Sequence, residues 1–158
     1  MNINVICIGK IKEKYWTAAI EEYSKRLSRF CSLKIIELKE APLPKNASAA
    51  DEQKVIEKEG EAILGRIGEG DYVIALEVEG KLYSSEDLAR EIESAAFGHS
   101  TVDLVIGGSL GLSSGVKRRA DLGLSFGRIT LPHQLARVVL LEQIYRAYKI
   151  INNETYHK

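Results

Sequence analysis

The sequence has 158 residues, and its 22 Lys and Arg balance its 22 Asp and Glu, so the formal net charge at neutral pH is zero. A hydrophobic content of 45% and a charged content of 28% are typical of a globular protein and exclude a disordered or fibrous chain. We expect a single domain over residues 1–158. No apolar run approaches the roughly 18 residues that cross a bilayer, and the first residues lack a signal-peptide pattern, so we expect a cytoplasmic protein without membrane contact.

The charges are unevenly distributed along the chain. Residues 115–158 carry eight Lys and Arg against three Asp and Glu, whereas residues 1–114 carry fourteen against nineteen. A basic segment can attract phosphate although the total charge is zero, but a solvated surface without a partner would show the same numbers. Cys7 and Cys31 show no metal-ligand spacing and are too few for a disulfide scaffold, so we expect no metal and a buried thiol at Cys7.

Strand-like and helix-like segments alternate along the chain, which is the pattern of an α/β fold with a parallel sheet. In chain order we predict a strand over Asn2–Ile8, a helix over Lys14–Arg29, a strand over Leu33–Leu38, a loop over Glu40–Ala50, a helix over Asp51–Arg66, a strand over Asp71–Val78, a helix capped by Ser84 or Ser85, a strand over Val102–Ile106, a short helix through Lys117–Ala120, a strand over Leu124–Leu131 and a last helix from Pro132 to about Ile151. The pattern predicts one sheet and no second domain.

A glycine-rich stretch, Gly107-Gly108-Ser109-Leu110-Gly111, follows the fourth predicted strand. Glycines at the end of a strand let the backbone approach a nucleotide-like ligand closely, although a structural turn explains the stretch nearly as well. The spacing matches neither the dinucleotide fingerprint nor a phosphate-binding P-loop, which argues against an NAD enzyme and an NTPase.

The last predicted helix carries two polar residues on a face that is otherwise apolar. His133 and Arg137 lie one turn apart, on the face that holds Leu141, Ile144 and Tyr148. Either Arg137 pairs with a carboxylate or helix end inside the chain, or both residues face a ligand or a partner subunit. The helix dipole disfavours the imidazolium of His133, which would leave a neutral ring able to act as a base. Because most sides of this helix are apolar, a dimer interface is a natural place for it.

Several motifs occur together and in order. They are Ile8-Gly9-Lys10, Glu13-Lys14-Tyr15, Ile106-Gly107-Gly108-Ser109-Leu110-Gly111-Leu112-Ser113, Leu124-Ser125-Phe126, Thr130-Leu131-Pro132-His133-Gln134-Leu135, Glu142-Gln143-Ile144-Tyr145-Arg146-Ala147 and Tyr156-His157-Lys158. With them the chain closely resembles, over nearly its whole length, the RlmH family of bacterial rRNA methyltransferases in the SPOUT superfamily.

The resemblance implies more than the spacing of residues could show. It implies a parallel sheet whose C-terminal part forms a trefoil knot, an S-adenosylmethionine (SAM) site in the knot loops, and a homodimer in which two subunits complete the active site. It also implies methylation of N3 of a pseudouridine in the subunit-interface stem-loop of 23S rRNA, on assembled ribosomes. A SPOUT enzyme that modifies another RNA, such as a tRNA, and a non-catalytic ribosome- or nucleotide-binding module are the alternatives.

By the same resemblance, particular residues receive roles. The cofactor site is expected to contain Leu76, Gly107, Phe126, Gly127, Arg128, Ile129, Thr130 and Leu131. The catalytic or substrate side is expected to contain His133, Arg137, Tyr156 and His157. We expect His133 or, from the tail, His157 to take the N3 proton of the target base, and Arg137 and Arg128 to contact the RNA.

Overall fold

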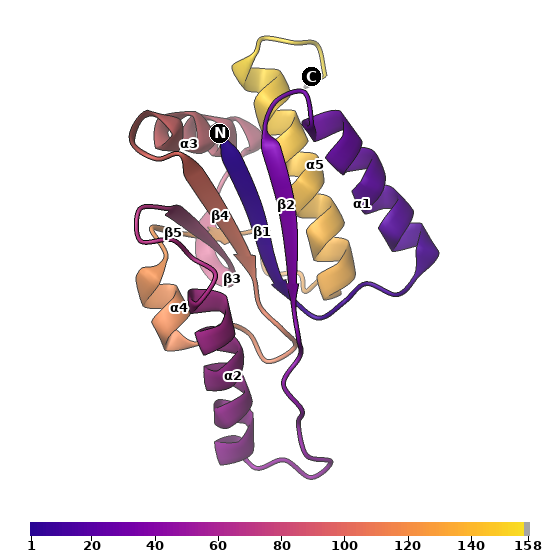
Figure 1. Cartoon of the computed structure of the whole chain (residues 1–158), viewed down its shortest axis with the longest axis vertical. Coiled ribbons are helices and arrows are strands. Elements are labelled where there is room, and N and C mark those ends of the chain that lie inside the picture. The colour runs from indigo at the N-terminus through magenta and orange to yellow at the C-terminus, as the bar shows by residue number, and fades with distance from the viewer. Residues whose placement is uncertain (157–158) are drawn as a thin grey trace.

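The computed structural model describes residues 1–156, which form a five-stranded parallel sheet with the strand order β2-β1-β4-β3-β5 (Figure 1). The strands are β1 (Asn2–Ile8), β2 (Ser32–Leu38), β3 (Tyr72–Leu82), β4 (Thr101–Ile106) and β5 (Leu122–Ser125). The helices are α1 (Lys14–Leu27), α2 (Ala49–Leu64), α3 (Ser85–Gly98), α4 (Ser114–Arg119) and α5 (His133–Ile151). The predicted α/β class and parallel sheet are therefore confirmed.

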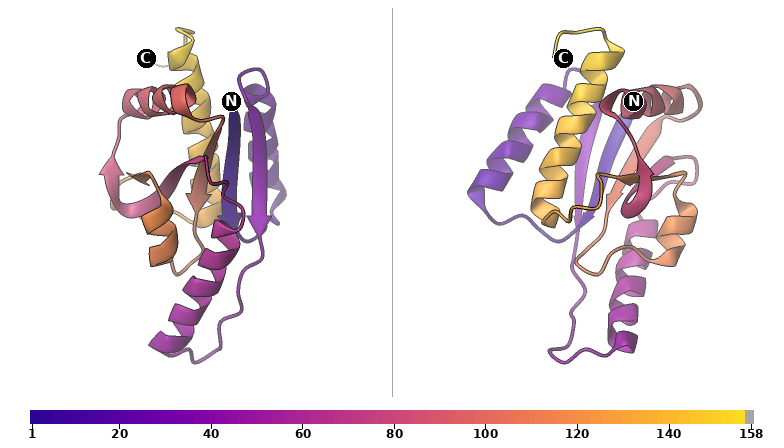
Figure 2. Two further views of the ribbon diagram at one scale, coloured as in Figure 1. Left: turned by 60° about the vertical axis from the view of Figure 1, so that its left-hand side comes forward. Right: turned by 180° about the vertical axis from the view of Figure 1, so that it is seen from behind.

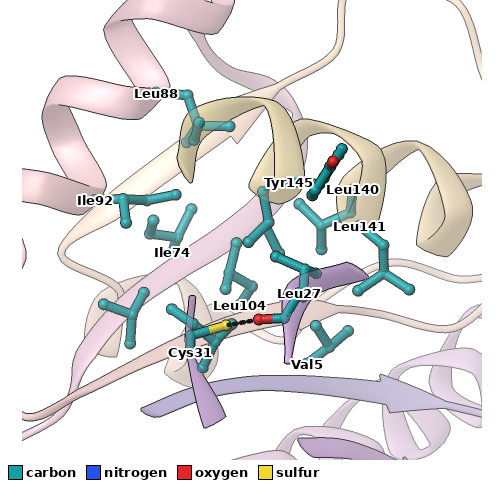
Figure 3. Packing of buried hydrophobic residues seen from close by; sticks show 14 of the residues in the cluster. Val5, Leu27, Cys31, Ile74, Leu88, Ile92, Leu104, Leu140, Leu141 and Tyr145 are labelled. Atoms are coloured by element: carbon teal, nitrogen blue, oxygen red, sulfur yellow. Dashed lines mark hydrogen bonds between the residues drawn. The ribbon is translucent and has the colours of Figure 1, made fainter. Parts of the chain in front are cut away.

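Helices cover both faces of the sheet, so each central strand is buried on two sides (Figure 2). Along β1, Ile3 and Val5 point to one face, where α1, α3 and α5 pack, and Ile6 points to the other, where α2 and α4 pack. Figure 3 shows the larger core, in which Leu140 and Leu141 of α5 meet Leu104 of β4. Cys7 is fully buried, as predicted. No helix within residues 1–156 is long and apolar enough to span a membrane.

The predicted fifth strand, Leu124–Leu131, is correct only for Leu124 and Ser125, and it begins earlier than predicted, at Leu122. β5 ends at Ser125, and residues 126–132 form a loop instead. Gly127 adopts a φ of +104°, which takes the backbone out of the extended region and ends the strand. The apolar residues Ile129 and Leu131, which suggested a strand, lie in this loop, and both line a pocket.

Several other boundaries differ from the prediction, most of them by one or two residues. β3 continues to Leu82 through an irregularity between Leu76 and Lys81, where Gly80 lies so close to β5 that a Cβ atom on it would come within 2.7 Å of the Gly123 carbonyl carbon. α2 begins two residues early because the Ser48 side chain accepts a hydrogen bond from the Asp51 N–H in a capping box. α1 ends at Leu27 rather than at Arg29.

Candidate functional site

A pocket of about 690 Å³ opens at the carboxyl edge of the sheet, beside the irregular part of β3 and the end of β4. Its walls come mainly from three segments: Leu76–Glu79 in the middle of β3, the glycine-rich loop after β4, and the loop that joins β5 to α5. Carboxyl edges of parallel sheets are the usual place for ligands, because the strand ends and the loops that follow them expose backbone groups there. The volume lies within the range of small-molecule sites.

The cofactor-site residues expected from the resemblance gather at this pocket. Those that line it are Leu76, Gly107, Phe126, Gly127, Ile129, Thr130 and Leu131. Arg128 is exposed and is not part of the lining. Residues that are up to 55 positions apart in the sequence therefore surround one cavity.

The loop from Phe126 to Leu131 is held at its base by a buried hydroxyl. Ser125 Oγ donates to the backbone oxygen of Val78 at 2.8 Å and accepts from the Gly127 N–H at 3.0 Å. Ser125 is almost completely buried, so the end of β3 and the start of the loop are tied together inside the protein. This connection fixes two walls of the pocket relative to each other.

The glycine-rich loop is a tight turn and also a wall of the pocket, so both readings of the sequence describe it. The Gly111 N–H donates to the Gly108 oxygen at 3.1 Å and closes the turn. A Cβ atom on Gly107 would lie 2.9 Å from Leu112 Cδ2, so a larger residue would push this turn apart.

His133 is the first residue of α5 and lines the pocket. Its Nδ1 atom is buried and has no hydrogen-bond partner within residues 1–156. A buried ring nitrogen without a partner is costly, and functional sites are where such groups are retained. The ring of His133 lines the pocket, so the imidazole can contact a group bound there.

Arg137 lies behind His133, and its partners are inside the chain. It is 2% exposed, and its guanidinium donates to Glu37 Oε2 at 2.8 Å, to the Ile8 oxygen at 2.8 Å and to the Gly9 oxygen at 2.7 Å. Of the two readings open for this residue, the structure shows the carboxylate pair. Arg137 thereby joins α5 to the ends of β1 and β2.

Tyr156 follows the C-terminal end of α5, and its side chain folds back onto the last turns of this helix. Its partner Glu142 is nine residues from His133, which corresponds to roughly 14 Å along the helix. Tyr156 packs on Tyr145 and donates to Glu142 Oε1 at 3.2 Å. His157, the other tail residue expected at the site, lies outside the described residues.

The sequence reasoning missed several residues near the pocket. Glu77, Glu79 and Lys117 contribute to its lining. Glu59 of α2 is 4% exposed, accepts from the Ala41 N–H at 3.1 Å and contacts Gly108, where a Cβ atom would lie 2.8 Å from Glu59 Oε1. Burial raises the pKa of Glu59, although the Ala41 N–H and nearby His133 act in the opposite direction. Because Glu59 continues the four-residue spacing of Val55 and Ile63, its place in an apolar stripe was the available signal.

Within residues 1–156 no three His, Cys, Asp or Glu side chains are grouped so that they could hold a metal ion. The pocket instead offers apolar walls, backbone groups of two loops, two carboxylates, one ammonium group and one imidazole. Such a set can bind a polar organic molecule and move one proton.

Comparison with known proteins identifies the family to which this chain belongs. A family model described as "Predicted SPOUT methyltransferase" matches residues 1–157. The chain belongs to this family. It is 57% identical to a protein named ribosomal RNA large subunit methyltransferase H from Clostridium novyi (strain NT), and the match covers 100% of both chains. Proteins of the same name from Limosilactobacillus reuteri (strain DSM 20016) and Streptococcus pneumoniae (strain CGSP14) are 54% and 52% identical, again over 100% of both chains. The suspected RlmH relationship is thereby confirmed.

Proposed function

We propose that this SPOUT methyltransferase transfers a methyl group from SAM to N3 of a pseudouridine in the subunit-interface stem-loop of 23S rRNA, on assembled ribosomes in the cytoplasm. The observation that carries the proposal is the pocket in which His133 stands beside the expected cofactor residues of three separate segments. The names of the full-length relatives support an rRNA substrate.

The residues of the pocket fit SAM as its cofactor. Phe126 and Leu131 supply apolar surface for a purine, and the backbones of the two loops supply donors and acceptors for its polar edge. Glu77 and Glu79 bring negative charge, which suits the positive charge of a sulfonium. When bound, SAM supplies an electrophilic methyl group.

The chain's own contribution to the reaction is alignment and one proton transfer. A uridine-type N3 carries a proton at neutral pH, and this proton must leave as the nitrogen gains the methyl group. His133 is placed to accept it, because its ring lines the pocket and its Nδ1 has no partner within the described chain. Gly127, Thr130 and the Ser125 tether hold the loop that excludes water from this side.

We further propose that the enzyme is a homodimer in which the tail of one subunit completes the pocket of the other. Within one chain Tyr156 cannot reach His133, since α5 separates them. Leu135, Val138 and Val139 of α5 are only half-buried, which leaves apolar surface for a second subunit. The neighbouring position of the two pocket loops is also what a C-terminal knot would produce, and we include the knot in the proposal.

The decisive measurement is methyl incorporation from labelled SAM into ribosomes that lack the modification, followed by mass spectrometry of the nucleosides. We expect one methyl group per 23S rRNA, recovered as N3-methylpseudouridine. Label in tRNA instead would show a different RNA target. No heat of binding on titration with SAM would show a binding module rather than an enzyme.

A further inference from the structure

The loop between β1 and α1, together with the first turn of α1, combines positive charge with exposed aromatic surface. Within residues 9–16, three lysines, Lys10, Lys12 and Lys14, oppose one carboxylate, Glu13, although the whole chain is balanced. All three lysines are exposed, and within the described residues none has an ion-pair partner within 4.0 Å. Tyr15 is 66% exposed and stands edge-on to Trp16, with 5.1 Å between the ring centres.

Hydrogen bonds to one ion pair hold this loop in place. The buried Arg137 binds the backbone oxygens of Ile8 and Gly9, and Glu37, which pairs with Arg137, accepts from the Ile11 N–H at 3.0 Å. Both ends of the segment Ile8–Ile11 are thus attached to the Arg137–Glu37 pair. A cationic loop anchored in this way presents its charges without paying much ordering entropy on binding.

The same anchor places the loop beside the pocket. Gly9 has a φ of +88°, and a Cβ atom on it would lie 3.6 Å from Cε1 of His133. The loop therefore continues directly from the wall that carries the proposed base.

We propose that residues 10–16 form a docking surface for the RNA strand next to the target nucleotide, with the lysines on phosphates and Tyr15 stacked on an unpaired base. This inference rests on the proposed function, because it takes the substrate to be RNA. Charge complementarity selects the occupant: phosphates repeat along a strand as the lysines do along the loop, and every base offers a face to an aromatic ring. Glu13 lies among the lysines and makes the expected charge gain smaller than three full contacts.

The test compares two triple variants in ribosome binding, by co-sedimentation at several salt concentrations, and in methyl transfer. The first is Lys10→Gln with Lys12→Gln and Lys14→Gln. The control is Lys25→Gln with Lys34→Gln and Arg66→Gln, which removes three exposed cations near the amino edge of the sheet. None of the substituted residues lines the pocket, so SAM binding, measured by calorimetry, reports whether each variant is folded.

We expect the first triple variant to raise the KM for ribosomes roughly tenfold with little change in kcat, and to leave SAM affinity intact. The slope of log affinity against log salt should fall by roughly two, since each contact on a single strand contributes about 0.7. The control should change neither quantity. An unchanged slope, or equal losses in both triple variants, overturns the proposal. If the first triple variant does not fold, the three single substitutions replace it in the test. Each should lower the slope of log affinity against log salt by about 0.7, and no change in this slope would contradict the proposal.

Tyr15 gives an independent arm. Tyr15→Ala should weaken ribosome binding roughly tenfold, and Tyr15→Phe should retain it, because stacking needs the ring and not the hydroxyl. Equal losses in both variants contradict stacking. Wild-type protein that binds ribosomes through this loop but transfers no methyl group would refute the proposed function and leave the docking surface standing.

Discussion

The two ends of α5 treat polar groups in opposite ways. At the first turn, His133 has a buried nitrogen without a partner in the described chain and faces a pocket. At the last turns, the charged groups are paired: Arg146 binds Glu142 at 2.6 Å, its Cζ lies 4.6 Å from the centre of the Tyr156 ring, and Glu154 pairs with Arg29 and Lys149. The first turn thus places an imidazole at a pocket, whereas the last turns use their charged groups to hold the tail.

Because of this difference, α5 can contribute His133 to the pocket of its own chain and hold the tail away from that pocket. A group that exchanges a proton with a ligand must be within hydrogen-bond reach of it, and a group that is presented to a partner subunit must be held in position. The ion pairs and the Tyr145–Tyr156 contact, with ring centres 5.0 Å apart, orient the tail at the end remote from its own pocket. Under the proposed homodimer, these contacts would present the tail to the pocket of the partner subunit.

The largest effect is expected from removing the imidazole at the first turn of α5. His133→Ala should lower the single-turnover rate of methyl transfer by about 10²–10⁴, the usual contribution of a general base, with SAM binding retained. His99→Ala is the matched control, since His99 binds the Gly70 oxygen at the amino edge of the sheet. A loss below tenfold for His133→Ala would remove His133 from the base role and direct attention to His157.

The second prediction tests whether the tail of one subunit serves the pocket of another. Two homodimers, one with His133→Ala and one with Tyr156→Ala, should each be nearly inactive. After co-expression, random pairing makes half of the dimers mixed, and each mixed dimer has one intact site, so about a quarter of wild-type activity should return. If Tyr156 acted only in its own chain, every site would carry one lesion and no activity would return.

The third prediction compares how much two arginines of α5 contribute to the free energy of unfolding of the protein. Arg137→Met should lower the free energy of unfolding by about 3 kcal/mol, because it leaves Glu37 and two backbone oxygens without their buried partner. Arg146→Met should cost at most about 1 kcal/mol, since the Glu142 pair is partly exposed. Urea unfolding of both variants measures the difference. Equal costs would mean that burial does not distinguish the two ends.

The sequence predicts the alternation of strands and helices well because hydrophobic periodicity is a local property. It also predicts the start of α5 at Pro132, since the fixed φ of proline suits a first turn. It fails where long-range contacts decide. The Ser125 tether and the positive φ of Gly127 end β5 early, and the contact of Gly80 with Gly123 extends β3, although neither contact is visible in a window of neighbouring residues.

The same limit applies to the site. The resemblance places His133 and the pocket loops, but it does not show that Arg137 is paired with Glu37, which is 100 residues away. Glu59 escaped notice because a carboxylate in a helix is normally solvated, and its burial depends on Ala41 and on the glycine-rich loop after β4. Spacing identifies which residues share a helix face, but the partner across the interface decides what they do.

The smallest expected effect concerns the pH dependence of stability. Its sign should differ between a carboxylate near the first turn of α5 and one beside its last turns. Burial raises the pKa of Glu59 near the first turn, so the stability it contributes is present below its unfolded pKa near 4.5 and is lost as the pH rises through its folded value. Beside the last turns, the hydrogen bond from Lys149 lowers the pKa of Glu154. The stability from Glu154 is therefore present above pH 4.5 and is lost as the pH falls through its folded value. We would measure the free energy of unfolding between pH 3 and 8. As the pH rises, Glu59→Gln should become more stable relative to the wild type, and Glu154→Gln should become less stable relative to it. Two curves of the same sign would show that the ends of α5 do not differ in this way.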